Sequence, residues 1–114
     1  MRGCYPAPPA EPRRLGIVAR MERADAEIII ENERVRVTAW TFAPGQATGM
    51  HRHELDYIVV PVSGGTFAVV APDGTTTDMQ QRAGLAYAGL AGAEHDVAVA
   101  GPQHAMFVEV ELKP

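Results

Sequence analysis

The chain has 114 residues, and 46% of them are hydrophobic, which fits one folded domain and excludes a disordered chain. Its formal net charge is −4 without a cluster of Lys and Arg, so neither nucleic acid nor an anionic membrane surface is an expected partner. The single cysteine, Cys4, excludes an internal disulfide. No stretch reaches the roughly 18 apolar residues of a membrane helix, and the N-terminus lacks the apolar core of a secretory signal. We therefore expect a cytoplasmic protein.

The N-terminal segment differs in composition from the rest of the chain. Four of the nine prolines lie within the first 14 residues. Proline has no backbone N–H and cannot serve a central strand. We expect residues 1–16 to form an extended arm and residues 17–114 to form one domain. The first part of this domain, from Ile17 to Glu27, favours only a short amphipathic segment.

From residue 27 onward the pattern predicts β-structure throughout. Apolar and polar residues alternate in short runs that turn residues separate, as in a sandwich or barrel. Pro72-Asp73-Gly74 predicts a hairpin, and Gly64-Gly65 predicts another turn. Trp40 and Phe42 share one face of their strand and are expected in the core. The strands are expected over residues 27–32, 34–42, 51–53, 57–63, 66–71, 75–80, 85–88, 95–100 and 105–112.

Histidines form the most informative pattern in the sequence. His51 and His53 are two residues apart, and His95 follows much later in the chain. Residues i and i+2 of a strand point to the same face, so two imidazoles at this spacing can converge on one cation. Neutral imidazole is a common ligand of Zn, Fe, Ni and Cu. The spacing therefore predicts a metal site if a third ligand comes from elsewhere. The fourth histidine, His104, lies in a turn and is expected at the surface or behind the ligands.

Two motifs of this chain resemble those of small single-domain cupins, which carry fixed spacings of glycine and histidine. The resemblance covers roughly residues 30–112. The first motif reads Gly45, five residues, His51-Arg52-His53, three residues, Tyr57, six residues, Gly64. The second reads Gly84, five residues, Leu90-Ala91-Gly92, two residues, His95, three residues, Val99.

This resemblance implies an all-β fold, the double-stranded β-helix or jelly-roll barrel of cupins, with a divalent metal ion inside its mouth. The implied ligands are His51, His53 and His95, and the ion could be Fe, Ni, Zn or Mn. Tyr57 replaces the glutamate of the family motif, which leaves three neutral ligands. It could act as an acid/base or orienting group, or it could simply pack in the barrel. Strand alternation points Glu54 and Asp56 away from the histidine face.

Within the cupins, the chain is similar to short bacterial proteins labelled as linked to β-alanine degradation. The shared run is His51-Arg52-His53 followed by Asp56-Tyr57-Ile58-Val59-Val60-Pro61. This similarity implies a small metabolite that carries a carboxylate. Arg36 or Arg52 would suit such a group if either lay at the barrel mouth.

Two functions remain open from the sequence. The first is a metal-dependent enzyme, similar to a dioxygenase or an isomerase, that acts on a small molecule. The second is a barrel that binds or senses a small molecule without catalysis and without a functional metal. We also expect a homodimer, because Ile28-Ile29-Ile30 is apolar on both faces of its strand and needs a cover.

Overall fold

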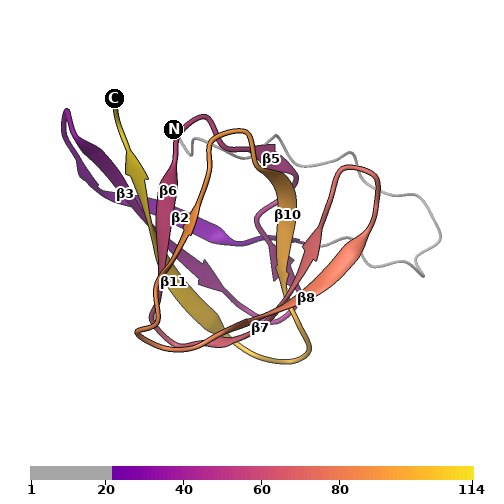
Figure 1. Cartoon of the computed structure of the whole chain (residues 1–114). Coiled ribbons are helices and arrows are strands. Elements are labelled where there is room, and N and C mark those ends of the chain that lie inside the picture. The colour runs from indigo at the N-terminus through magenta and orange to yellow at the C-terminus, as the bar shows by residue number, and fades with distance from the viewer. Residues whose placement is uncertain (1–21) are drawn as a thin grey trace.

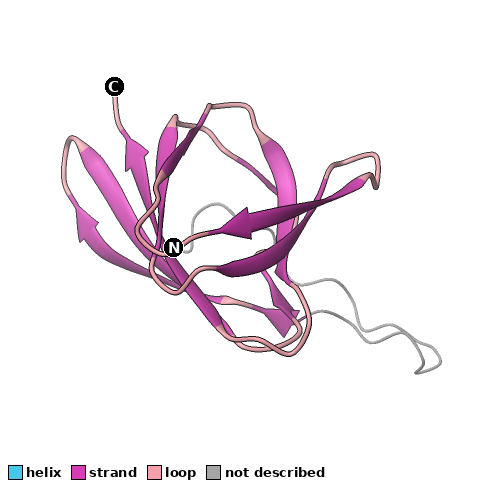
Figure 2. Cartoon of the chain, turned by 60° about the horizontal axis from the view of Figure 1, so that its bottom comes forward, coloured by secondary structure: helices cyan, strands magenta, loops and turns pink. Residues whose placement is uncertain are grey.

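The computed structural model describes residues 22–114, so the proline-rich arm expected over residues 1–16 lies outside the described residues. The described chain is all β, and its strands curve around a common interior (Figures 1 and 2). One sheet has six strands, with β1, β4, β10, β7 and β8 in this order and β5 paired to β10. The other has five, in the order β2, β3, β11, β6 and β9.

The strands of the six-stranded sheet are β1 (Glu22–Arg23), β4 (Gln46–Ala47), β5 (His51–Arg52), β7 (Gly65–Val70), β8 (Thr76–Gln81) and β10 (Glu94–Val99). Those of the five-stranded sheet are β2 (Asp25–Glu31), β3 (Val35–Phe42), β6 (Tyr57–Pro61), β9 (Tyr87–Gly89) and β11 (Ala105–Leu112). β1 pairs with β4 in parallel, and the other described pairings are antiparallel.

The core lies between the two sheets and follows from the alternation of the strands. Trp40 and Phe42 are buried on the inner face of β3, as the sequence predicts, and Phe42 is fully buried. The ring of Phe42 contacts Phe67 of the other sheet and Phe107 of β11, with centroids 5.3 and 5.4 Å apart. Such aromatic pairs hold the two sheets at a fixed separation.

Turn residues place most strand ends where the sequence predicts them. At the β7–β8 hairpin, Gly74 adopts a φ of 90°, which favours glycine, and its N–H donates to the Ala71 carbonyl at 2.9 Å. Asp73 accepts a hydrogen bond from the Thr75 N–H at 2.9 Å. The predictions missed the two-residue strands β1 and β4. Of the amphipathic segment expected over residues 17–27, residues 17–21 lie outside the described residues, and residues 22–27 are mainly extended. Strands of two residues carry too little alternation to be recognised.

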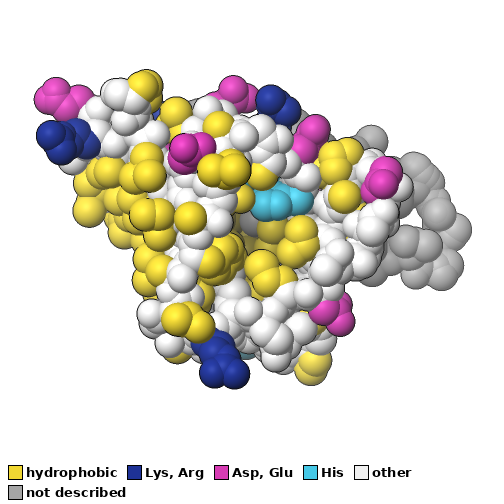
Figure 3. Space-filling model, viewed as in Figure 1, with side chains coloured by type: hydrophobic (Ala, Val, Ile, Leu, Met, Phe, Trp, Pro, Cys, Tyr) yellow, Lys and Arg dark blue, Asp and Glu magenta, His cyan; other side chains and the backbone are white. Residues whose placement is uncertain are grey.

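The outer face of the five-stranded sheet is apolar over its three central strands. Strand parity places the following side chains there: Val35, Val37 and Ala39 of β3, Ile58 and Val60 of β6, and Met106, Val108 and Val110 of β11. We call this set the outer apolar face; Val37 and Ala39 within it are buried, and its other members are partly buried. In Figure 3 hydrophobic side chains gather on the side of the molecule where Figure 1 shows β3, β6 and β11. At its margin Val62 and Leu112 are 49% and 41% exposed.

The isoleucine run of β2 has a different geometry from the regular strand that the sequence predicts. The register between β2 and β3 shifts between Ile28 and Ile30, which makes Ile29 an extra residue in a β-bulge. Ile29 and Ile30 are each about half exposed. Within residues 22–114, the structure contains no helix that could span a membrane.

Candidate metal centre

Strand pairing brings the three histidines together. β5 pairs with β10 so that His51 lies directly opposite His95. Beyond the end of β5, the His53 N–H donates to the Ala93 carbonyl and the Gly92 N–H donates to the His53 carbonyl, both at 2.8 Å. This backbone pairing keeps His53 extended, so its ring returns to the face that holds His51.

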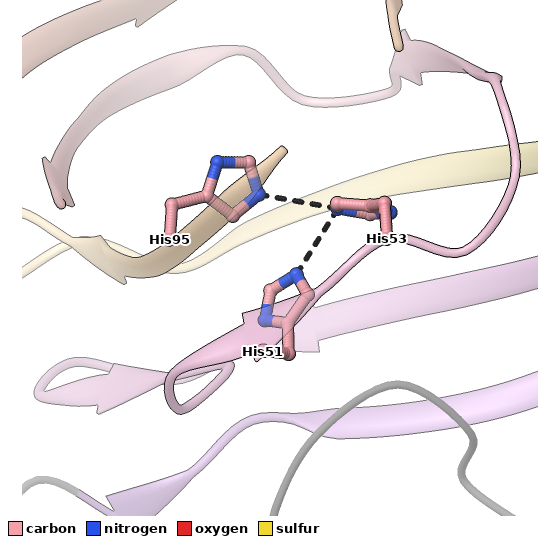
Figure 4. Close-up of side chains that lie close together, drawn as sticks. All are labelled: His51, His53 and His95. Carbon is pink, nitrogen blue, oxygen red and sulfur yellow. Dashed lines mark hydrogen bonds between the residues drawn. The ribbon is translucent and has the colours of Figure 1, made fainter. Parts of the chain in front are cut away.

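The three imidazoles meet at their Nε2 atoms. The His53 Nε2 atom lies 3.1 Å from His51 Nε2 and 3.2 Å from His95 Nε2 (Figure 4). One ligand nitrogen from each ring lies within 4.8 Å of the others. His51 and His53 are buried, and His95 is partly buried. The structure thus places all three predicted residues in one cluster that two distant parts of the chain build.

Backbone contacts fix the orientation of His51. Its Nδ1 atom lies 2.8 Å from the Gly49 carbonyl oxygen. A carbonyl only accepts, so this contact places a hydrogen on Nδ1 and leaves Nε2 with a free lone pair. The pKa of His51 is lowered, mainly because burial disfavours the charged ring. His51 is therefore a neutral imidazole whose lone pair faces the centre of the cluster.

The other two rings are also held neutral. Burial, together with the neighbouring His51 and His95, lowers the pKa of His53 to about 3. Burial and His51 lower the pKa of His95 to about 4. Neutral imidazole is the form that binds metal, because a protonated ring has no lone pair to donate.

Tyr57 packs flat on one of these rings. Its phenol ring stacks on the His53 imidazole, with centroids 3.8 Å apart and an angle of 15° between the planes. Its opposite neighbour is Gly89 of β9, the cross-strand partner of Tyr57. A Cβ atom at Gly89 would lie 2.1 Å from Tyr57 Cζ, so only glycine leaves room for the ring. Tyr57 lines the cavity beside the histidines and holds His53 by contact.

Glu109 of β11 is a site residue that the sequence analysis missed. It is buried, and one carboxylate oxygen, Oε1, accepts a hydrogen bond of 3.3 Å from Trp40 Nε1. The other, Oε2, lies 3.6 Å from His53 Nδ1. Burial and the nearby Glu111 raise the pKa of Glu109 to about 7. Because His53 is neutral, the contact between the two residues is not an ion pair at neutral pH. The strand alternation could have indicated its position, because Glu109 lies two residues after the core residue Phe107 and so shares its strand face.

The cluster opens into a small cavity of about 90 Å³, enough for several waters or a ligand of a few atoms. Figure 3 shows histidine in a hollow whose rim is mostly hydrophobic. The apolar wall consists of Val59, Val69, Met79, Val97 and Phe107. Among the described residues that line the cavity, none is Arg or Lys.

The remaining predicted residues lie away from the histidines. His104 is exposed, and so are Glu54 and Asp56. The Arg36 guanidinium bonds Glu31 at 3.2 Å and Glu111 at 3.3 Å, so its charge is already paired. Arg52 is exposed and donates to the Gly92 carbonyl at 3.4 Å. Neither arginine lines the cavity.

The donor set is compatible with a divalent metal ion. Three neutral nitrogen donors on one side leave the other side open to the cavity, as in catalytic rather than structural metal sites. Zn, Fe, Ni and Mn all accept imidazole ligands, so the donors alone do not select one metal.

Comparison with known proteins decides the family. No protein-family model matches the chain. The chain is 45% identical over 84 residues to the β-alanine degradation protein BauB of Pseudomonas aeruginosa, which covers 74% of this chain and 87% of BauB. Its fold matches the crystal structure of a cupin domain from Bordetella pertussis Tohama I with a TM-score of 0.81 and 38% identity, over 85% of this chain and all of that domain. The chain belongs to the cupins.

The fold is also similar to that of a cupin with much lower sequence identity. A cupin superfamily protein from Desulfitobacterium hafniense matches 94% of each chain with a TM-score of 0.62 at 18% identity. The cupin jelly roll expected from the two motifs is therefore confirmed, and so is the similarity to the β-alanine degradation group. In the present chain, Tyr57 occupies the position at which the motif of the resembled cupins has glutamate.

Proposed function

We propose that this cupin holds one divalent metal ion on His51, His53 and His95 and acts on a small metabolite in the adjoining cavity, in the manner of a dioxygenase or an isomerase. The observation that carries this proposal is the convergence of three neutral imidazoles, with Nε2 atoms 3.1 and 3.2 Å apart, at the wall of a cavity. A metal ion bound there would polarise an oxygen-bearing substrate or activate water or dioxygen.

The residues around the cluster have separate tasks in this proposal. The Gly49 carbonyl keeps the His51 lone pair directed at the centre, and Tyr57 holds the plane of the His53 ring. The valine and phenylalanine wall excludes bulk water, which strengthens polar interactions inside the cavity. Tyr57 would contact the substrate as an orienting group.

The chemistry of the cavity restricts the substrate. The related BauB is named for β-alanine degradation, which supports a small metabolite with a carboxylate. Arg36 and Arg52, the arginines considered for this group, do not line the cavity. In this proposal the cavity would therefore take the carboxylate without an arginine fork, and the apolar wall favours a short carbon chain.

Metal titration of two matched variants tests the proposal. The chelator-treated protein is titrated with Zn²⁺ and with Fe²⁺ under anaerobic conditions, and bound metal is measured by calorimetry and elemental analysis. The wild type and His104→Ala, which removes an exposed histidine outside the cluster, should bind one ion per chain. His53→Ala should bind none while keeping its cooperative unfolding. Binding of one ion per chain by His53→Ala would contradict the assignment of His53 as a metal ligand.

A second function is favoured by the apolar cavity wall, which suits a ligand held without chemistry. In this alternative the barrel binds or senses a small molecule and uses no functional metal. Screening small carboxylates by thermal shift, with and without Zn²⁺, separates the two functions. Ligand stabilisation that is the same in both conditions favours the binding module, whereas stabilisation that needs the metal favours the enzyme.

The proposal includes a homodimer in the cytoplasm. The outer apolar face covers three central strands of one sheet, and a contiguous apolar surface of this kind marks a contact site. We propose that a second copy of the chain covers this face, because a twofold axis would place the outer apolar face of one copy against that of the other. The half-exposed Ile29 and Ile30 lie at the edge strand of the same sheet and would extend the interface.

A further inference from the structure

The side of His53 that faces away from the cluster lacks a hydrogen bond. Its Nδ1 atom is buried, and among the described residues it has no hydrogen-bond partner. The Glu109 Oε2 atom lies 3.6 Å away, which is just beyond hydrogen-bond distance. Buried polar atoms without a partner are rare in folded proteins and call for an explanation.

The hydrogen bonds of the cluster explain this missing partner. His51 carries its hydrogen on Nδ1, because it donates to the Gly49 carbonyl, so its Nε2 atom can only accept. The 3.1 Å contact from His53 Nε2 to His51 Nε2 therefore requires a hydrogen on His53 Nε2. In this arrangement the neutral His53 ring has no hydrogen on Nδ1 and cannot donate to Glu109.

Metal binding requires the other neutral form of the His53 ring. To donate its Nε2 lone pair to an ion, neutral His53 must carry its hydrogen on Nδ1 instead. The acceptor next to that atom is Glu109 Oε2, whose position is fixed by the bond from Trp40 Nε1 to the other oxygen. A closure of a few tenths of an ångström would make this contact a hydrogen bond.

We infer that Glu109 is a positioning residue, which accepts the Nδ1 hydrogen of His53 and thereby selects the ring form that binds metal. This inference rests on the proposed metal function. Next to a bound cation the ionised form of Glu109 is favoured, so this carboxylate would also supply, from behind the ligand, the negative charge that the glutamate of the resembled motif would bring at the position of Tyr57. Three neutral imidazoles alone would leave the charge of a divalent ion unbalanced.

A neighbouring carboxylate provides the matched control. Glu111 lies two residues along β11, is equally buried and faces the same side, but it pairs with Arg36 at 3.3 Å and not with a histidine. If any buried negative charge on this strand favoured metal binding, Glu111 would matter as much as Glu109. If the hydrogen bond to His53 matters, the two residues will differ.

The test measures Zn²⁺ affinity, with Zn²⁺ itself as the probe, on Glu109→Gln, Glu111→Gln and the wild type. Glu109→Gln keeps the side-chain volume and an acceptor for Trp40, and it should bind Zn²⁺ about 10–100-fold more weakly, as is usual when the partner behind a metal-bound histidine is lost. Glu111→Gln should stay close to the wild type. Equal affinities for all three proteins, or equal losses in both variants, overturn the inference.

A spectroscopic measurement on the wild type makes the test independent of how well the variants fold. Imidazole ¹⁵N NMR of the Zn²⁺-loaded wild type should show His53 protonated at Nδ1 and bare at Nε2, and the metal-free protein should show the reverse. A bare Nδ1 in the loaded protein refutes the role of Glu109. If His53→Ala binds Zn²⁺ like the wild type, the metal function itself fails. Normal binding by Glu109→Gln with no binding by His53→Ala rejects only the present inference.

Discussion

The phenol of Tyr57 covers one face of the His53 imidazole, with ring centroids 3.8 Å apart. Stacking of this kind fixes the plane of a ring without engaging its nitrogen atoms. His53 lies between the other two histidines, so the plane of this one ring determines whether all three Nε2 atoms meet. The residue that replaces the glutamate of the family motif thus has a structural task beside the proposed metal.

Shortening Tyr57 separates the role of its ring from that of its hydroxyl. Tyr57→Phe keeps the stacked ring, so we expect unfolding free energy within about 1 kcal/mol of the wild type and unchanged Zn²⁺ affinity. Tyr57→Ala removes a buried ring and should cost about 3–5 kcal/mol. Urea unfolding and Zn²⁺ titration measure both effects. A Tyr57→Phe variant that loses as much as Tyr57→Ala contradicts the stacking role.

The contact between Tyr57 and Gly89 can be tested by a double-mutant cycle. A Cβ atom at Gly89 would lie 2.1 Å from Tyr57 Cζ, so Gly89→Ala forces the ring off His53 and should cost about 1–3 kcal/mol. In the Tyr57→Ala background the added methyl group meets open space, and its cost should largely vanish. Urea unfolding of the four proteins gives the coupling energy. An unchanged cost in both backgrounds contradicts a steric origin.

Lowering the pH should destabilise the metal-free protein already near pH 6.5, well above the pH at which ordinary carboxylates titrate. Folding holds the pKa of His53 at about 3 and that of His95 at about 4, and lowers that of His51. Below the unfolded value of 6.5 the unfolded chain therefore binds protons that the folded protein does not bind. Stability must fall as pH falls below 6.5, by roughly 1.4 kcal/mol per pH unit for each of His53 and His95.

Glu109 opposes this trend, and its removal gives the control. Its folded pKa of about 7 lies above the ordinary value of 4.5, so between these values the folded state binds the extra proton and gains stability as pH falls. Urea unfolding at about pH 7.5 and about pH 5.5 should show a loss in acid, and Glu109→Gln should steepen it. Equal stability at both pH values in the wild type contradicts neutral histidines in the fold.

Charge on the outer apolar face should prevent dimer formation. Val108 lies on the outer side of β11, between Ala39 of β3 and Val60 of β6. Val108→Glu would bury a charge in the proposed interface, and we expect it to shift the protein to a single 12.2 kDa species in light scattering. Thr76→Glu, on exposed β8 of the other sheet, should remain dimeric. A monomeric wild type contradicts the homodimer directly.

Much of this architecture could be predicted because alternation and turns are local properties. The strands around Trp40, the hairpin at Gly74 and the two histidine motifs all follow from short stretches of sequence. The alternation of β11 places Glu109 on the inner face, but a charged residue is usually expected in solvent. Its burial beside His53 can be recognised only once the pairing of β11 with β3 and β6 is known. The bulge at Ile29 was equally invisible, because it depends on the register with β3.

The pairing of β5 with β10 has a consequence for how the protein matures. His53 and His95 are separated by 42 positions along the chain, and their rings meet only after the intervening strands have found their registers. Contacts between such distant segments form slowly, because the loop that joins them loses entropy when it closes. The arrival of metal-binding capacity during refolding should therefore report the last stage of barrel assembly, and not the first collapse of the chain.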